Sequence, residues 1–195
     1  MIEHTPSIAR SEFILGGQRS GKSRRAETLA RQWLEAAPAH RALLIATGQA
    51  WDEEMRERIA RHQADRARRV PGMATVEAPV ALAGTLRRVG DAQTLVVVDC
   101  LTLWLTNLMM PADPAQACGE AAVIAASEAL CEAVATAPGP VLLVGNEIGL
   151  GVIPLGREVR AFVDALGRLN QRVAATCARV TLMAAGLPLT LKGQA

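Results

Sequence analysis

The sequence lacks long hydrophobic runs and a large net charge, and both absences exclude classes of protein. Its longest apolar runs, such as residues 95–98, are far shorter than the ~20 residues of a membrane-spanning helix, so no membrane span is expected. A net charge of +2 gives no support for a general nucleic-acid-binding protein. The first 12 residues carry charges and a proline but no apolar core, which argues against a secretory signal.

The chain is also poor in cysteine and has no C-x-x-C pair. Its four cysteines are Cys100, Cys118, Cys131 and Cys177. Their scatter argues against a zinc site or a disulfide framework and fits the reducing cytoplasm, where we expect the protein to act. The length of 195 residues, of which 50% are hydrophobic, suits one domain with a sizeable core. We expect this domain to span residues 1–195, with a loose start at 1–11 and a tail at 193–195.

Short apolar segments alternate with helical stretches along the chain. The expected strands are 12–16, 41–47, 73–77, 94–99, 140–145, 179–184 and a weaker 187–191. The expected helices are 22–37, 52–69, 80–89, 101–110, 115–137 and 157–176. Several strands are continuously apolar, as in parallel sheets that are covered on both faces. The alternation predicts a doubly wound, mostly parallel α/β fold with helices on both faces of the sheet.

Residues 16–23 have the complete pattern G-x-x-x-x-G-K-[ST] of a phosphate-binding loop, placed between an expected strand and an expected helix. Glycines let successive N–H groups face a polyphosphate, and the helix N-terminus adds positive potential. Lys22 can bridge β- and γ-phosphates, and the hydroxyl of Ser23 can hold Mg²⁺. The motif predicts a P-loop NTPase fold of the RecA-like type that binds a nucleoside triphosphate. The expected nucleotide contacts are Gly16, Gly17, Gln18, Arg19, Ser20, Gly21, Lys22 and Ser23, together with Glu77 at the end of a strand.

Asp99 ends the apolar strand 94–99, which is the position of a Walker B aspartate that binds Mg²⁺ directly or through water. An alternative is that Asp99 caps the helix expected from residue 101, because aspartate is a favoured N-cap. The presence of a phosphate loop in the same chain favours the metal role.

His62 lies on the expected helix 52–69, where it continues the stripe of Met55 and Ile59. A histidine at the edge of an apolar stripe is usually a partly buried packing residue, and by this pattern alone a catalytic role is not favoured. The basic residues around it are interleaved with acidic residues and have no aromatic neighbours, which argues against a nucleic-acid-binding patch. A solvated face or a phosphate contact both remain open for them.

Residues 145–154 form a glycine-rich loop directly after a buried strand. At ten residues it exceeds the ~2–6 residues usual for a strand-to-helix connection, although a plain connection remains the alternative. Such a loop at the carboxyl edge of a parallel sheet is where ligands bind in open α/β folds. The candidate substrate-contacting residues are Asn146, Glu147, Gly149 and Gly151.

Taken in order, these motifs resemble one family over residues 13–192. The resemblance rests on the segments 16–24, 46–47, 52–55 with 58–59 and 62, 98–107, 146–151 and 167–171. The chain is similar to the bifunctional adenosylcobinamide kinases / adenosylcobinamide-phosphate guanylyltransferases of cobalamin biosynthesis. The resemblance implies a P-loop α/β domain that assembles as a homotrimer.

The resemblance also implies two reactions. ATP or GTP first phosphorylates the hydroxyl on the aminopropanol arm of adenosylcobinamide. GTP then forms a covalent guanylyl-histidine, and the GMP passes to the substrate phosphate to give adenosylcobinamide-GDP. The nucleophilic histidine of the family falls on His62, which overturns the weak expectation from its helix position; a neutral imidazole is a competent nucleophile near pH 7. Lys22 is the second expected catalytic residue.

Two other functions share the phosphate loop. A different P-loop small-molecule kinase needs no histidine intermediate, and a nucleotide-dependent switch or binding module needs no acceptor. A GTPase switch normally carries the base-reading motif N-K-x-D, which does not occur in this sequence. The preference for GTP therefore comes from the resemblance alone.

Overall fold

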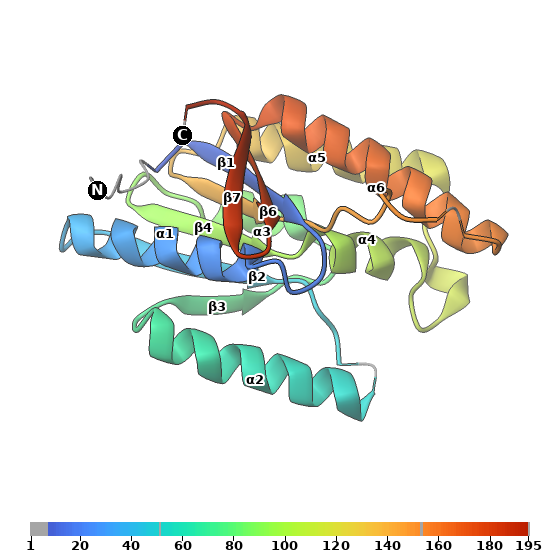
Figure 1. Cartoon of the computed structure of the whole chain (residues 1–195), viewed down its shortest axis with the longest axis horizontal. Helices are drawn as coiled ribbons and strands as arrows, with labels where there is room; N and C mark the ends of the chain where they lie inside the picture. Colours follow the sequence, from blue (N-terminus) through green and yellow to red (C-terminus); the bar gives the residue numbers. More distant parts are fainter. Residues whose placement is uncertain (1–7, 51, 153, 195) are drawn as a thin grey trace.

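The computed structural model describes residues 8–50, 52–152 and 154–194. Its seven strands form one sheet in the order β3-β2-β4-β5-β1-β6-β7 (Figure 1). The strands are β1 (Ser11–Gly16), β2 (Arg41–Ala46), β3 (Ala74–Glu77), β4 (Thr94–Asp99), β5 (Val141–Val144), β6 (Arg179–Ala184) and β7 (Leu187–Lys192). Neighbouring strands are parallel except that β7 runs antiparallel to β6. The predicted mostly parallel α/β fold is confirmed.

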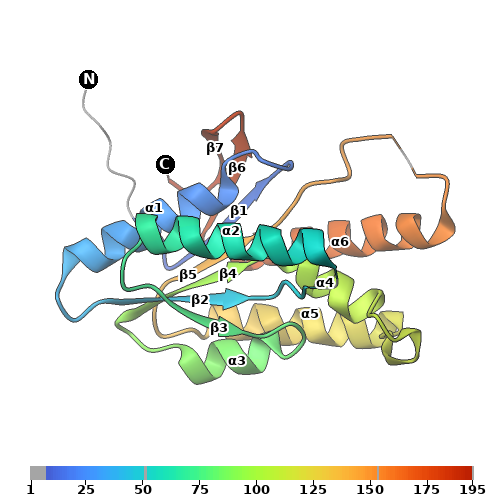
Figure 2. The ribbon, with the colours of Figure 1, turned by 90° about the horizontal axis from the view of Figure 1, so that it is seen from below.

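The helices pack on both faces of this sheet. They are α1 (Lys22–Ala36), α2 (Glu53–Arg69), α3 (Leu82–Val89), α4 (Leu101–Met109), the 3-10 turn η1 (Pro114–Gln116), α5 (Glu120–Ala135) and α6 (Arg157–Thr176). Figure 2 shows α1 and α2 on one side of the strands and α3 and α5 on the other. Two buried clusters reflect these layers, one shared by the sheet with α3 to α6 and one shared by the sheet with α1.

Alternation along the strands produces the two clusters. In β1, Phe13 and Leu15 belong to the larger cluster, whereas Ile14 between them packs under α1. Successive side chains of a strand point to opposite faces, so a run such as 13–15 must be apolar throughout when both faces are covered. This is why the continuously apolar segments of the sequence are central strands.

Two predicted boundaries are wrong for identifiable reasons. The single helix expected at 115–137 is split, because Asp113 accepts a hydrogen bond from the N–H of Ala115 and closes one 3-10 turn before Gly119 starts α5 as its N-cap. Ser11, expected in the loose start, is buried in β1 and accepts a hydrogen bond from the N–H of Ala178. Residues 1–7 of the expected loose start, Ile153 of the glycine-rich loop and Ala195 of the expected tail lie outside the described residues.

Candidate active site

The phosphate loop joins β1 to α1 and is held by two neighbouring segments. The N–H of Glu147 donates to the carbonyl oxygen of Gly16 at 3.2 Å, and the N–H of Gly186, in the β6–β7 turn, donates to the carbonyl of Ser20 at 3.0 Å. Gly21 is the N-cap of α1 with φ 102°, a left-handed conformation that suits glycine. The N-terminal N–H groups of α1 are thereby presented at the carboxyl edge of the sheet, where they form an anion-binding site.

Lys22, Ser23 and Asp99 meet at this edge. The hydroxyl of Ser23 donates to Oδ2 of Asp99 at 3.0 Å, and the Nζ of Lys22 donates to the carbonyl of Gly17 at 2.6 Å. The N-cap of α4 is Cys100, without a side-chain cap, so the alternative that Asp99 caps this helix is wrong. In the sheet, β5 lies between β1 and β4. Asp99, at the end of β4, is therefore two strands away from β1, which leads into the phosphate loop.

The charge of Lys22 is held in a partly desolvated environment. Burial lowers the pKa of Lys22 below its ordinary value, and the nearby guanidinium of Arg58 lowers it further, while Cys100 and Asp99 oppose these effects. A polyphosphate placed at the loop supplies the missing negative charge. The arrangement therefore favours an anion next to Lys22, and it brings Arg58 of α2 into the electrostatic field of the loop.

His62 lies on α2, which rests against α1. At the C-terminal end of α2, Arg69 donates to Oε2 of Glu27 on α1 at 3.0 Å. Positions 58, 62 and 69 fall within about 60° around the helix axis, since each residue advances by about 100°. The imidazole therefore shares the side of α2 that carries Arg58 and Arg69, the residues that interact with α1. Its ring is exposed, so the expectation of a partly buried packing histidine is wrong.

The glycine-rich loop after β5 is attached to the site at its root. The N–H of Asn146 donates to the hydroxyl of Thr102 on α4 at 3.0 Å, and the amide of Asn170 on α6 donates to the carbonyl of Asn146 at 3.1 Å. Oε1 of Glu147 accepts from the N–H of Gly149 at 2.8 Å and so closes a local turn. Beyond this root, residues 148–152 of the loop are exposed.

Glu77 is not brought to the phosphate loop. It ends β3, the strand at one side of the sheet, and is exposed beside Ala46 of β2. Four strand spacings of about 4.8 Å separate β3 from β1, which gives roughly 19 Å. Any nucleotide contact of Glu77 thus lies away from the phosphate-binding amides.

Sequence reasoning gave no separate role to the polar residues that organise this edge. Thr47 donates its hydroxyl to the carbonyl of Cys100 at 2.7 Å and accepts from the N–H of Cys100 at 2.9 Å. Asn107 donates to the carbonyls of Thr47 and Pro79. Asn107 is a buried amide on a predominantly apolar helix. Because buried polar side chains need hydrogen-bond partners, an asparagine in this apolar segment is the sequence feature that indicates such a structural role.

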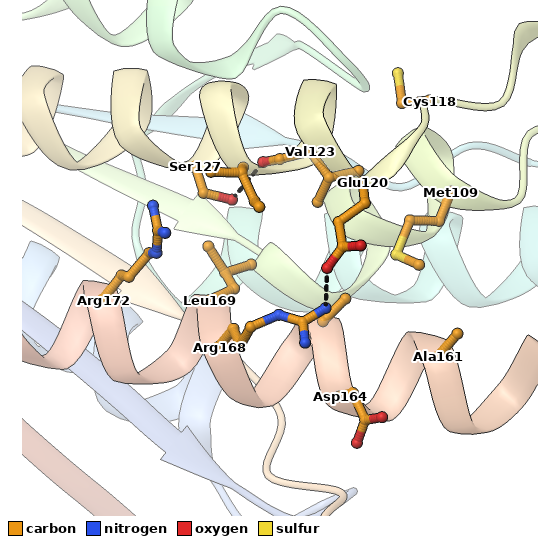
Figure 3. A pocket seen from close by; sticks show the side chains of 12 residues that line it. Met109, Cys118, Glu120, Val123, Ser127, Ala161, Asp164, Arg168, Leu169 and Arg172 are labelled. Carbon is orange, nitrogen blue, oxygen red and sulfur yellow. Dashed lines mark hydrogen bonds and ion pairs between the residues drawn. The ribbon is translucent and has the colours of Figure 1, made fainter.

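A hollow of about 220 Å³ lies away from the phosphate loop, between α5 and α6 (Figure 3). Val123 and Leu169 supply apolar walls, and Arg168 donates to Glu120 at 3.1 Å across it. None of the predicted site residues lines this hollow. Among the described residues, no helix is long and apolar enough to cross a membrane, and no group of three or more His, Cys, Asp or Glu side chains is arranged to hold a metal.

The mostly parallel sheet, the phosphate loop and the Ser23–Asp99 pair place the chain in the P-loop class of α/β proteins. The described fold is similar to that of a Pyrococcus horikoshii protein, PH0250, with a TM-score of 0.54 at 8% identity over 97% of this chain and 89% of that one. It is also similar to the flagellar accessory protein FlaH of Methanocaldococcus jannaschii, with a TM-score of 0.51 at 12% identity over 96% and 80% of the two chains. These likenesses concern the fold alone.

Sequence comparison identifies the family. Residues 12–191 match the family described as cobinamide kinase / cobinamide phosphate guanyltransferase, and the chain belongs to this family of bifunctional enzymes. It is 50% identical over 183 residues to the bifunctional adenosylcobalamin biosynthesis protein CobP of Pseudomonas aeruginosa, covering 94% of this chain and 98% of that one. It is 34% identical over 187 residues to the protein CobU of Escherichia coli, which carries the same description, covering 92% and 98%.

Proposed function

We propose that this protein phosphorylates the aminopropanol hydroxyl of adenosylcobinamide with ATP or GTP and then converts the product to adenosylcobinamide-GDP with GTP. The observation that carries the proposal is the contact of Ser23 with Asp99 beside a complete phosphate loop, in a chain of this family. Loop, hydroxyl and carboxylate are the parts that phosphoryl transfer from a nucleoside triphosphate requires.

In the kinase step the loop acts by positioning and by neutralising charge. The N–H groups of α1 and the loop hold the triphosphate, and Lys22 exchanges its contact with the carbonyl of Gly17 for the β- and γ-phosphates. The substrate hydroxyl attacks the γ-phosphorus, its proton passes to water, the bond between the β–γ bridging oxygen and the γ-phosphorus breaks, and the nucleoside diphosphate leaves. Ser23 and Asp99 would hold Mg²⁺, because their hydroxyl and carboxylate are hard oxygen ligands of the kind that suits this ion. When bound, Mg²⁺ neutralises phosphate charge.

In the guanylyl step His62 is the proposed nucleophile. A ring nitrogen attacks the α-phosphorus of GTP, pyrophosphate leaves, and a phosphoramidate bond forms. The phosphate of the first product then attacks the same phosphorus, the N–P bond breaks, and the imidazole is regenerated. The exposure of His62 supports this role. None of the described residues of α2 is buried, so this helix can be repositioned without opening the core.

The remaining candidates receive narrower proposed roles. Glu77 contacts a nucleotide away from the phosphate-binding amides, and the segment that contains Asn146, Glu147, Gly149 and Gly151 contacts the acceptor substrate. We further propose that the chain works as a single catalytic domain in the cytoplasm, with all described strands in one sheet and all four cysteines as free thiols.

Labelling with α-³²P-GTP, followed by peptide mapping, tests the function. We expect acid-labile label on the peptide that contains His62, and no label on the variant His62→Ala, which keeps at least part of its kinase turnover. His40→Ala is the matched control, because this histidine stacks on Trp33. We expect Lys22→Ala to lose both activities. Label that persists on the His62→Ala protein rejects the assigned nucleophile.

The same experiment separates the competing functions. Phosphorylation of cobinamide without covalent GMP would identify a kinase that lacks the second activity. Nucleotide binding with neither reaction would identify a switch or a binding module. The proposed homotrimer is tested separately by sedimentation equilibrium, which is expected to give about three times the chain mass of 20.6 kDa.

A further inference from the structure

The connection between β5 and α6 carries several exposed apolar side chains. They are Ile148, Leu150, Val152 and Leu155, with exposed fractions of 42%, 84%, 98% and 97%. A single exposed apolar residue is normal on a protein surface, whereas several on one short segment mark a binding surface. The described residues of this segment, 148–152 and 154–155, are here called the apolar loop.

The apolar loop starts directly beside the proposed phosphoryl-transfer site. Its root is fixed by the hydrogen bonds from Glu147 to Gly16 and from Asn146 to Thr102. The preceding strand β5 lies between β1, which leads into the phosphate loop, and β4, which ends in Asp99. Figure 2 shows the connection as a wide excursion between the sheet and the start of α6. A ligand that extends from the loop to its root thus reaches the phosphate loop.

We infer that the apolar loop docks the corrin macrocycle of the acceptor substrate, an inference that rests on the proposed function. The hydroxyl to be phosphorylated is on a flexible arm, so only this arm must enter the phosphate site while the macrocycle stays outside. Two hollows of the described chain measure about 220 and 310 Å³. Drug-sized ligands already fill pockets of ~300–1,000 Å³, and a corrinoid is larger. An open apolar surface therefore accommodates it better than either hollow.

The chemistry of the loop matches that of a corrinoid. The methyl-bearing rim of the macrocycle is apolar and is removed from water by side chains such as Leu150 and Val152. Its peripheral amides need hydrogen-bond partners, which the exposed backbone around Gly151 provides. A second copy of the chain is the other possible occupant of an apolar surface, but nothing would then require that surface to be anchored at the phosphate loop.

The test is the double variant Leu150→Asn/Val152→Asn. Both side chains are exposed, so the substitutions leave the core intact. We expect the KM for cobinamide to rise about tenfold or more, while the KM for ATP and the kcat at saturating cobinamide stay within about twofold. The double variant Leu150→Met/Val152→Ile keeps both side chains apolar and is expected to have the same KM for cobinamide as the unmodified protein. Leu191→Asn, at a position of β7 with 56% exposure, is the matched control and leaves the KM unchanged.

Three further measurements separate the outcomes. Equilibrium dialysis of cobinamide, followed by its visible absorbance, is expected to show about tenfold weaker binding to the double variant. Labelling with α-³²P-GTP needs no corrinoid and is expected to persist. If the proposed function is wrong, the unmodified protein does not phosphorylate cobinamide. Dialysis still measures whether the loop binds cobinamide in that case, because it needs no turnover. If both the KM and the affinity measured by dialysis are unchanged in the double variant, the loop does not dock the macrocycle. If the double variant sediments as a smaller species than the unmodified protein, the loop contacts a second copy of the chain instead. Either result would overturn the inference.

Discussion

At the scale of single residues, the space around the phosphate loop determines which substitutions it tolerates. Gly16 has φ 152°, and a Cβ there would lie 2.4 Å from the carbonyl oxygen of Met183 and 2.5 Å from Oγ of Ser20. The first of these atoms belongs to the backbone of β6, which pairs with β1 and cannot move aside alone. The glycine is therefore required by the packing of two strands as well as by the turn.

Gly16→Ala is expected to lower the free energy of unfolding by about 1–3 kcal/mol, because strain and overpacking each cost of this order. Gly167→Ala is the matched control, since a Cβ at that helical position meets nothing within 4 Å outside its own helix. We expect it to be neutral or stabilising by up to about 1 kcal/mol. Urea unfolding followed by circular dichroism measures both, and equal stability of the two variants would contradict the packing argument.

Burial also determines how reactive each cysteine is expected to be. Burial raises the pKa of Cys100 to about 11 and that of Cys177 to about 12, so at pH 8 their thiolate fractions are on the order of 10⁻³ and 10⁻⁴. Cys118 and Cys131 are partly exposed. We expect Ellman's reagent at pH 8 to modify these two first, with the other pair reacting at comparable rates only in guanidinium. Mass mapping that finds Cys100 among the first modified thiols would contradict this expectation.

At the scale of elements, α2 differs from the other long helices because none of its described residues is buried. Its cap is nevertheless well formed, since Asp52 accepts a hydrogen bond from the N–H of Met55 at 2.7 Å. A helix that is capped but has no buried residue has a low free energy of local opening. This property suits an element that must bring a nucleophile to a nucleotide.

Hydrogen exchange measured by mass spectrometry tests this view of α2. We expect the amides of α2 to exchange at least about tenfold faster than those of α4, whose residues pack in the core. Addition of GTP is expected to slow exchange in α2 in the unmodified protein and to have no such effect in Lys22→Ala. Protection of α2 equal to that of α4 without nucleotide would show that the helix is held by contacts other than those described.

The sequence predicted the elements well because their signals are local. The phosphate loop and the apolar strand that ends in Asp99 can each be read within ten residues. The exposure of His62 could not be read in this way, because it depends on whether another element covers that stripe of the helix. The position of Glu77 depends on the order of strands, which local periodicity does not specify. The roles assigned to these two residues stay predictions.

At the scale of the whole molecule, a buried ion-pair cluster joins the sheet to the helix that follows the phosphate loop. Glu12 of β1 has no exposed surface, accepts from Nε of Arg25 on α1 at 2.8 Å, and accepts from the hydroxyl of Thr181 on β6 at 2.8 Å. Arg179 of β6 lies 3.4 Å from its second oxygen. One carboxylate thus connects three elements that converge on the nucleotide site.

Removal of this carboxylate takes away the anion that the partly buried Arg25 and the buried Arg179 share. Glu12→Ala is therefore expected to lower the free energy of unfolding by about 3–5 kcal/mol, the usual cost of breaking a buried ion pair. Glu120→Ala removes a glutamate that pairs with Arg168 on the surface, where solvent screens the charges, and is expected to change little. Urea unfolding of both variants gives the comparison. Equal stability would mean that Arg25 and Arg179 find other partners or water, and that α1 is held to the sheet by the apolar contacts of Ala26, Leu29 and Ala30 alone.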